Sequence, residues 1–242
     1  MIKTIYKREL KSYFGTPIAY VFIVIFIFLT GIFTFKLAHF YENNQADLRA
    51  FFFWHPWLYL FLIPAVSMRL WSEERKSGTI ELLFTLPIKP STAILGKFLA
   101  AWSFIAISLL LTFPMVLTVY YLGEPDSGVI LVSYLGSLLM AGGYLAIGSA
   151  FSAVTKNQVI SFILTAVACL CLILIGFGPF IKLVSGIFPP FILEHLRMLS
   201  FTEHFDSLQK GVLDLRDIVY FISLIGCGLY ATYVILEEKK AE

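Results

Sequence analysis

Long apolar runs separated by short polar stretches make up most of the chain. A helix that crosses a membrane needs about 20 predominantly apolar residues. The pattern predicts six such helices in one all-α integral membrane domain that covers residues 1–242. The predicted spans are residues 18–35, 51–71, 92–122, 129–154, 159–175 and 218–236.

Three of these runs contain features that predict how they pack. A helix over residues 92–122 rises about 1.5 Å per residue and exceeds a hydrocarbon core of ~30 Å, so it should tilt, protrude or kink at Pro114. Pro56 and Pro64 should bend the second span or delay its start. The fourth span is rich in Gly, Ala and Ser, which let a neighbouring backbone approach closely, so we expect the tightest packing there.

The first 14 residues have the pattern of a surface helix, because their apolar residues fall near one helical face. The basic residues off that face are Lys3, Lys7, Arg8 and Lys11. Four basic side chains near an anionic leaflet are worth about 1 kcal/mol each, so we expect residues 1–14 to lie flat on the membrane as an interfacial helix. A signal peptide is the competing interpretation. It is weaker, since no small-residue cleavage site follows the apolar run.

A polar insertion separates the second span from the third. Residues 68–76 place opposite charges at helical spacing, which predicts a helix that leaves the membrane. Gly78 is expected to end it, because glycine adopts a left-handed conformation without steric cost. A second short helix is expected over residues 78–88, with Thr79 as its N-cap and Pro87 at its end. It would carry Glu81 in its first turn and an apolar face made of Leu82, Leu83 and Leu86.

The residues of this insertion that carry a family resemblance are Glu73, Glu74, Arg75, Gly78, Thr79, Glu81, Leu82, Leu83, Leu86 and Pro87. Together they resemble the cytoplasmic loop of ABC-2 type transporter permeases, in which the short helix is the coupling helix that docks on an ATPase subunit. Upstream, Pro56-Trp57, Ile63-Pro64 and Met68-Arg69-Leu70-Trp71 are similar to the gliding-motility-type permeases. The alternative is an ordinary charged turn between two membrane helices.

The resemblance implies the fold of an ABC-2, or type V, exporter. Such a fold has six spans, an N-terminal interfacial or elbow helix, a cytoplasmic coupling helix, and re-entrant external helices between spans five and six. The implied partners are cytoplasmic ABC ATPase subunits, a second permease that is identical or different, the lipid bilayer and, for the gliding-motility subgroup, an extracytoplasmic auxiliary protein, with no nucleic acid. The sequence has no G-x-x-x-x-G-K-[ST] phosphate loop, so ATP and Mg²⁺ are expected on the partner ATPase, with no cofactor and no enzymatic activity in this chain.

The helical pattern breaks down after the fifth span. Residues 176–193 are apolar but are interrupted by Gly176, Gly178, Pro179, Gly186, Pro189 and Pro190. Irregular backbone at membrane depth is tolerated only where it is buried in protein or faces water, so we expect a pair of short re-entrant helices. The resemblance implies that they form an external gate. The polar residues 194–217 are expected outside the membrane, with an amphipathic helix over residues 205–212.

Composition and charge exclude a soluble domain and orient the chain. The sequence is 59% hydrophobic and 14% charged, whereas about a quarter of the residues of a soluble domain are charged. With the N-terminus inside, twelve of the 18 Lys and Arg residues fall on the inner side. They are Lys3, Lys7, Arg8, Lys11, Arg69, Arg75, Lys76, Lys89, Lys97, Lys156, Lys239 and Lys240. The positive-inside rule therefore predicts a multi-pass inner-membrane protein with cytoplasmic N- and C-termini.

Candidate chemistry within the chain is sparse. Charged groups at mid-bilayer are costly and mark function, but none falls in the middle of a predicted span; His55 and Lys182 come nearest, and both are expected close to the outer interface. The histidines and cysteines lack metal-ligand spacing, so no metal site is predicted. Glu203, His204 and Asp206 fit an acid–base cluster, but an external turn with capping residues is the simpler interpretation.

Two functions remain after these exclusions. The first is a permease subunit of an exporter, in which the ATPase stroke moves the insertion as a lever. The second is a non-transporting transmitter that relays the stroke to an extracytoplasmic partner, as the gliding-motility resemblance suggests. A transporter needs a cavity between facing spans, whereas a transmitter needs a large partner contact on residues 36–50 and 194–217.

Overall fold

The structure is a computed structural model that describes residues 1–242 except 43–46, 81–88, 185, 187–188 and 239–242. The described residues form helices and connecting turns, without strands. The helices are α1 (Ile2–Phe14), α2 (Pro17–Ile32), the π-helix η1 (Phe33–Leu37), α3 (Arg49–Phe53), α4 (His55–Ser67), α5 (Ser72–Ser77), α7 (Pro90–Leu110), α8 (Phe113–Leu122), α9 (Ser127–Val154), α10 (Gln158–Leu174), α11 (Gly178–Val184), α12 (Pro190–Arg197), α13 (Phe201–Gln209) and α14 (Leu215–Glu238).

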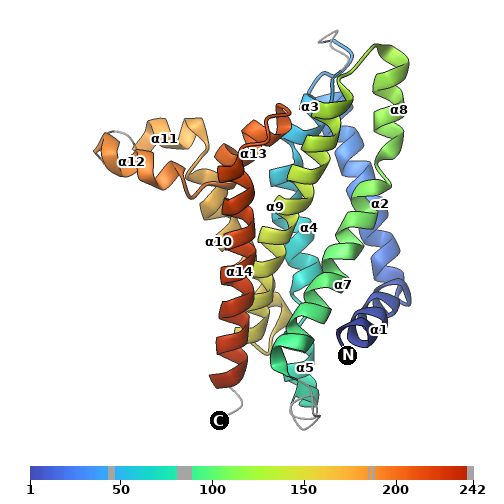
Figure 1. Cartoon of the computed structure of the whole chain (residues 1–242), viewed down its shortest axis with the longest axis vertical. Coiled ribbons are helices and arrows are strands. Elements are labelled where there is room, and N and C mark those ends of the chain that lie inside the picture. The colour runs from blue at the N-terminus through green and yellow to red at the C-terminus, as the bar shows by residue number, and fades with distance from the viewer. Residues whose placement is uncertain (43–46, 81–88, 185, 187–188, 239–242) are drawn as a thin grey trace.

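The long helices run side by side along the long axis of the molecule (Figure 1). One end of this bundle holds α1, α5 and the last turns of α14, and we call it the terminal end. The opposite end, which holds α3, α13 and the start of α9, is the distal end. The terminal end carries the charged residues of α1 and α5.

Four helical segments are long and apolar enough to cross a membrane. They are Pro17–Leu37, Pro90–Leu122, Ser127–Val154 and Leu215–Glu238. A shorter apolar helix, α10, lies in the fifth predicted span, and α3 and α4 divide the second. The all-α membrane fold is therefore observed, whereas the full set of six spans stays a prediction.

Prolines and polar caps set where several helices begin. The third predicted span breaks at Leu111 and Thr112, and α8 starts with Pro114 in its first turn, which confirms the predicted kink. The missing N–H and the ring of a proline prevent an unbroken helix at that point. Asp126 caps α9 by accepting a hydrogen bond from the backbone N–H of Gly128 at 2.7 Å. Each device fixes a helix start from local sequence alone.

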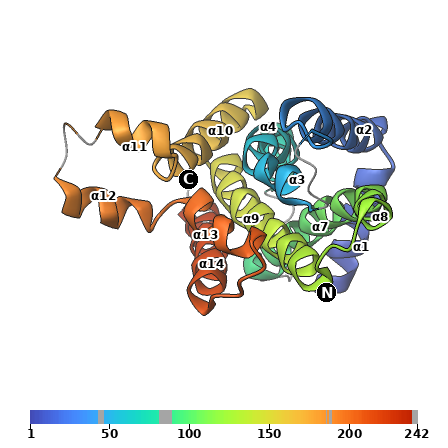
Figure 2. The ribbon, with the colours of Figure 1, turned by 90° about the horizontal axis from the view of Figure 1, so that it is seen from above.

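Helix α9 is the centre of the bundle, as its small residues predicted. It lies between α4, α7, α10, α13 and α14 (Figure 2). A Cβ atom on Gly148 would lie 2.0 Å from the Ser67 hydroxyl of α4, and one on Gly143 would lie 2.9 Å from Leu224 of α14. Glycine is therefore required at position 148, where the Ser67 Cβ would also lie only 2.5 Å away, whereas at position 143 the end of the Leu224 side chain would have to shift.

Polar groups inside the bundle are mostly paired. Tyr59 and Ser137 share a hydrogen bond of 2.7 Å, and the Tyr144 hydroxyl donates to the Pro56 carbonyl at 2.9 Å. His55 is fully buried, and its Nδ1 lies 3.0 Å from the Ser137 hydroxyl. These bonds join α4 to α9 near the distal end. They stabilise the bundle, because a buried polar group without a partner is costly.

Helices α11 and α12 extend sideways from the bundle at the distal end (Figures 1 and 2). Leu183 of α11 is 75% exposed and Phe191 of α12 is 70% exposed. Two short helices thus occupy the region predicted to be re-entrant, but in the single chain they do not fold back into the bundle.

The amphipathic helix expected over residues 205–212 is displaced toward the N-terminus. The observed helix α13 begins at Phe201, because Ser200 accepts a hydrogen bond from the Thr202 backbone N–H at 3.2 Å and acts as the cap. It ends before Gly211, which has a left-handed φ of 81°. The predicted bounds were wrong, since they followed the apolar residues rather than the cap and the glycine.

The contact between α9 and α14 yields a matched pair of variants. A Cβ on Gly228 would lie 2.8 Å from the backbone carbon of Ala146, whereas one on Gly226 would meet nothing within 4 Å. We expect Gly228→Ala to lower the free energy of unfolding by about 1–3 kcal/mol through overpacking. Gly226→Ala should leave stability unchanged or raise it by about 0.5–1 kcal/mol, because alanine favours a helix. Reversible unfolding of purified protein in mixed micelles measures both, and equal effects would contradict the close packing.

Candidate functional site

The polar insertion is attached to the terminal end of α9 through one tryptophan and two serines. We call residues 68–80 the connector. Trp71 is 1% exposed, and its Nε1 donates to the Ser149 hydroxyl at 3.1 Å. The Ser152 hydroxyl accepts the backbone N–H of Trp71 at 3.0 Å and that of Ser72 at 3.1 Å. The same hydroxyl lies 3.0 Å from the Met68 carbonyl, to which it donates.

The helix of the connector, α5, ends as the sequence predicted. Gly78 has φ 74° and ψ 0°, the left-handed conformation expected of it. Arg75 donates to the backbone carbonyl of Ala153 at 2.5 Å and thereby fixes α5 to the last turn of α9. The Thr79 hydroxyl lies 2.9 Å from the Ser77 hydroxyl of α5. Its role as the cap of the next helix stays a prediction, because residues 81–88 lie outside the described residues.

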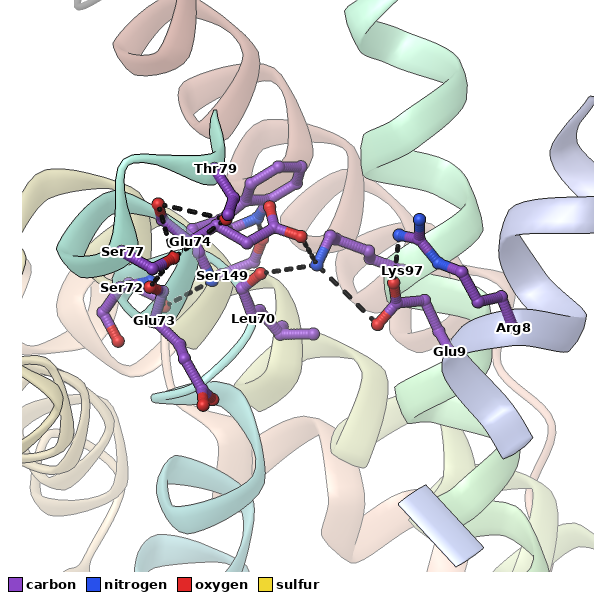
Figure 3. A network of polar contacts seen from close by, with 12 residues as sticks. Arg8, Glu9, Leu70, Ser72, Glu73, Glu74, Ser77, Thr79, Lys97 and Ser149 are labelled. Atoms are coloured by element: carbon purple, nitrogen blue, oxygen red, sulfur yellow. Dashed lines mark hydrogen bonds and ion pairs between the residues drawn. The ribbon is translucent and has the colours of Figure 1, made fainter. Parts of the chain in front are cut away.

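Lys97 of α7 is the point at which three segments meet. Its side chain is 5% exposed, and its Nζ donates to the Leu70 carbonyl at 3.0 Å (Figure 3). The same ammonium lies 2.8 Å from the Glu74 carboxylate of α5 and 3.7 Å from the Glu9 carboxylate of α1. It also lies 5.1 Å from the centroid of the Trp71 ring, within the range of a cation–π interaction. A buried charge needs such partners, so Lys97 holds α1, α5 and α7 together.

Helix α1 packs one face on α7 and leaves its bases on the surface. A Cβ on Gly96 would lie 2.8 Å from the Ile5 side chain, and the Tyr6 hydroxyl donates to Ser103 at 3.1 Å. The exposed residues are Lys3, Lys7, Arg8 and Lys11. This arrangement suits a helix that rests on charged lipid headgroups, as expected for the interfacial helix.

Tyr13 lines the site on the side of α1. Its ring stacks on Phe104 of α7 with centroids 5.2 Å apart. Burial, reinforced by the nearby Glu9 carboxylate, raises the pKa of the Tyr13 phenol above its ordinary value. The phenol therefore stays neutral, and the charges of the site are those of the acids and bases around it.

A cavity of about 450 Å³ lies between α1, the connector and α7. Glu9, Arg69, Glu74 and Lys97 are among the residues that line it. Within the described part of the chain, Arg69 Nε and Glu74 Oε2 are buried without hydrogen-bond partners. The site therefore retains a donor and an acceptor that can change partners when the connector moves.

The other predicted site residues lie near the distal end or outside the described residues. The coupling-helix residues Glu81, Leu82, Leu83, Leu86 and Pro87 lie outside the described residues. Gly176 is close to the α13 start, since a Cβ there would lie 2.0 Å from the Ser200 hydroxyl. The other predicted gate residues lie in or beside α11 and α12; they are Gly178, Pro179, Gly186, Pro189 and Pro190.

The acid–base cluster considered for Glu203, His204 and Asp206 is not assembled in the structure. His204 pairs with Asp217 at 2.7 Å and thus joins α13 to α14, whereas Asp206 pairs with Lys210. Glu203 and Asp206 are three positions apart and line the same cavity, whereas His204 points to α14. Over the described ranges, no group of three or more His, Cys, Asp or Glu residues could hold a metal ion.

Sequence reasoning missed the residues that hold the connector. Lys97 was counted only as an inner positive charge, although a lone lysine inside an apolar helix is itself a signal for a buried pair. The small residues of the fourth span predicted close packing, but not that the hydroxyls of Ser149 and Ser152 would bond the connector. Their spacing of three places both on one face of α9, where they can bond one partner.

The long apolar helices, with charged residues gathered at one end of the bundle, define a multi-pass membrane protein. A family model described as ABC-2 family transporter protein matches residues 58–236. The chain therefore belongs to the ABC-2 transporter family, the membrane components of ABC transporters. No curated protein sequence matches the chain.

The Lys97 cluster predicts a large loss of stability when its cation is removed. We expect Lys97→Met to lower the free energy of unfolding by about 3–5 kcal/mol, because Glu74 and the Leu70 carbonyl would be left without their donor. Lys11→Met, on the exposed face of α1, is the matched control and should change stability by less than about 0.5 kcal/mol.

A double-mutant cycle identifies the partner. Combining Lys97→Met with Glu74→Gln should show a coupling of about 1–3 kcal/mol by unfolding in mixed micelles. Additive effects of the two substitutions would show that the ion pair does not join α5 to α7.

Proposed function

We propose that this chain is the permease subunit of an ABC exporter, driven by a separate cytoplasmic ATPase. The observation that supports the proposal best is the Lys97 cluster, which ties the connector to α1 and α7. A force applied to α5 would reach two other segments at once, because separating them would strand a buried charge. A connector held in this way is suited to act as a lever.

The coupling residues would have separable roles. Leu82, Leu83 and Leu86 would fill an apolar groove of the ATPase, as buried anchors do at protein interfaces. Glu73, Arg75 and Glu81 would set the register of docking through charge pairs, and Glu74 would do so in addition to its bond to Lys97. Arg75 and Trp71 would then pass the motion of α5 to α9 through Ala153 and Ser149.

The charge distribution supports a cytoplasmic location for the terminal end. The exposed bases of α1 lie there together with the charged connector. We therefore assign the chain to the inner membrane with six spans and with both termini in the cytoplasm. The distal end, including α11 and α12, would face the outside.

The complete transporter would contain a second permease and two ATPase subunits. Apolar side chains on α10 are open for such an interface: Val159 is 63% exposed, Ile163 51% and Val167 53%. The exit route would run between α4 and α10 of facing subunits, gated by residues 176–193. ATP and Mg²⁺ would bind the ATPase subunits rather than this chain.

One observation favours a second function, a mechanical transmitter of the gliding-motility type. Apolar residues are exposed at the distal end, in the segments where such a transmitter would contact an extracytoplasmic partner. They are Leu37, Tyr41, Met198, Leu199, Val212 and Leu213. A purified complex with an external protein and a solid dimer interior would favour the transmitter over the exporter.

The coupling helix provides the direct test of the proposal. We expect Leu83→Asp to abolish co-purification with the ATPase, because a carboxylate cannot enter an apolar groove without a large desolvation cost. The matched control is Leu213→Asp, on the distal end, where Leu213 is 58% exposed. Both variants should keep the thermal stability of the unmodified chain. Normal ATPase association of the Leu83 variant would defeat the proposal.

A further inference from the structure

A second cavity, of about 350 Å³, opens at the distal end. It lies between the start of α4, the link from α10 to α11, and α13. Three aromatic residues line it: Phe53, Trp57 and Phe177. The rings of Trp57 and Phe177 meet edge to face, with centroids 5.4 Å apart and planes at 83°. Its size is within the range of small-molecule sites, about 300–1,000 Å³.

The charged residues that line this cavity are both acidic. Glu203 and Asp206 come from successive turns of α13. Asp206 is partly neutralised, since Lys210 pairs with it. Across the part of the chain that the structure describes, Glu203 has no ion-pair or hydrogen-bond partner. Glu203 is an exposed residue, so the mouth of the cavity carries a solvated negative charge beside aromatic rings.

Gln209 also lines the cavity, with its amide fixed by a neighbour. Its Nε2 donates to Asp206 at 2.8 Å, which fixes the amide orientation, because the amide oxygen would be repelled by the carboxylate. The Gln209 Oε1 is buried and has no donor among the described residues. This oxygen is shielded from solvent, so the group that a cationic ligand in the cavity would meet is the Glu203 carboxylate.

We propose that this cavity binds a primary ammonium group carried on an apolar body. The N–H groups of the ammonium are donors for Glu203, while the aromatic rings of Trp57 and Phe177 attract its positive charge. An anion would be repelled by Glu203, and a neutral alcohol would leave its charge unpaired. The role of the cavity as the outer end of an exit route rests on the proposed function, whereas the binding itself does not.

Calorimetry with three matched probes tests the chemistry. The purified full chain in an uncharged detergent is titrated at pH 7 with 2-phenylethylammonium, uncharged 2-phenylethanol and anionic phenylacetate. We expect the ammonium to bind at least about ten-fold more tightly than the alcohol, and phenylacetate not to bind. Equal affinity for the ammonium and the alcohol would overturn the proposal, and so would the absence of ammonium binding.

Substitutions at the cavity localise the binding. Glu203→Gln and Trp57→Leu should each weaken ammonium binding about three- to ten-fold. The matched control is Glu124→Gln, an exposed acid in the turn between α8 and α9 that does not line the cavity. Unfolding midpoints confirm that the variants fold. If Glu203→Gln binds as tightly as the control, the assignment is wrong.

The ammonium could come from a soluble amine or from a lipid headgroup, and nanodiscs separate the two. The titration is repeated in phosphatidylcholine nanodiscs with and without phosphatidylethanolamine. Competition by phosphatidylethanolamine identifies the headgroup as the ligand, and unchanged affinity identifies a soluble amine. The assay contains no ATPase and no second permease, so a failure to bind leaves the proposed function intact.

Discussion

The buried ammonium of Lys97 is the constraint on which the terminal end depends. Removing such a charge from water costs several kcal/mol, and only its partners recover that cost. Here the partners come from three separate segments: the Leu70 carbonyl, Glu74 of α5 and Glu9 of α1. None of these segments can move alone without leaving a charge or a carbonyl unpaired. The Lys97 ammonium thus holds the connector, α1 and α7 together.

The connector reaches the centre of the bundle through serine hydroxyls. Ser149 accepts from the Trp71 indole and from the Thr232 hydroxyl of α14, so one side chain joins the connector, α9 and α14. Small residues make this possible, because they allow the three backbones to approach and leave their polar groups within bonding distance. Ser152 performs the same task for the first turn of α5. Helix α5 is therefore attached to α9 by hydrogen bonds from both its first turn and Arg75.

Much of the fold could be predicted from the sequence because it depends on local physics. Apolar runs, Pro114 and Gly78 determine helices, a kink and a cap within a few residues of themselves. The hub at Lys97 could not be predicted in this way, since its partners lie 27 and 88 positions away in the chain. The pairing of His204 with Asp217 could not be predicted for the same reason, since Asp217 belongs to the next helix. Long-range pairing is decided by packing, which one sequence does not reveal.

Helix α4 offers a physical link between the two ends of the molecule. Its C-terminal end continues into the connector, and its N-terminal end carries Trp57, which lines the distal cavity. The Tyr144 hydroxyl bonds the Pro56 carbonyl, so α9 is attached to α4 at that end as well. Pro64 lies inside α4 and removes one helical hydrogen bond, which makes the helix easier to bend at that point. In the proposed function, a movement of the connector would either carry α4 as a rod or bend it at Pro64, and only the first of these would displace Trp57.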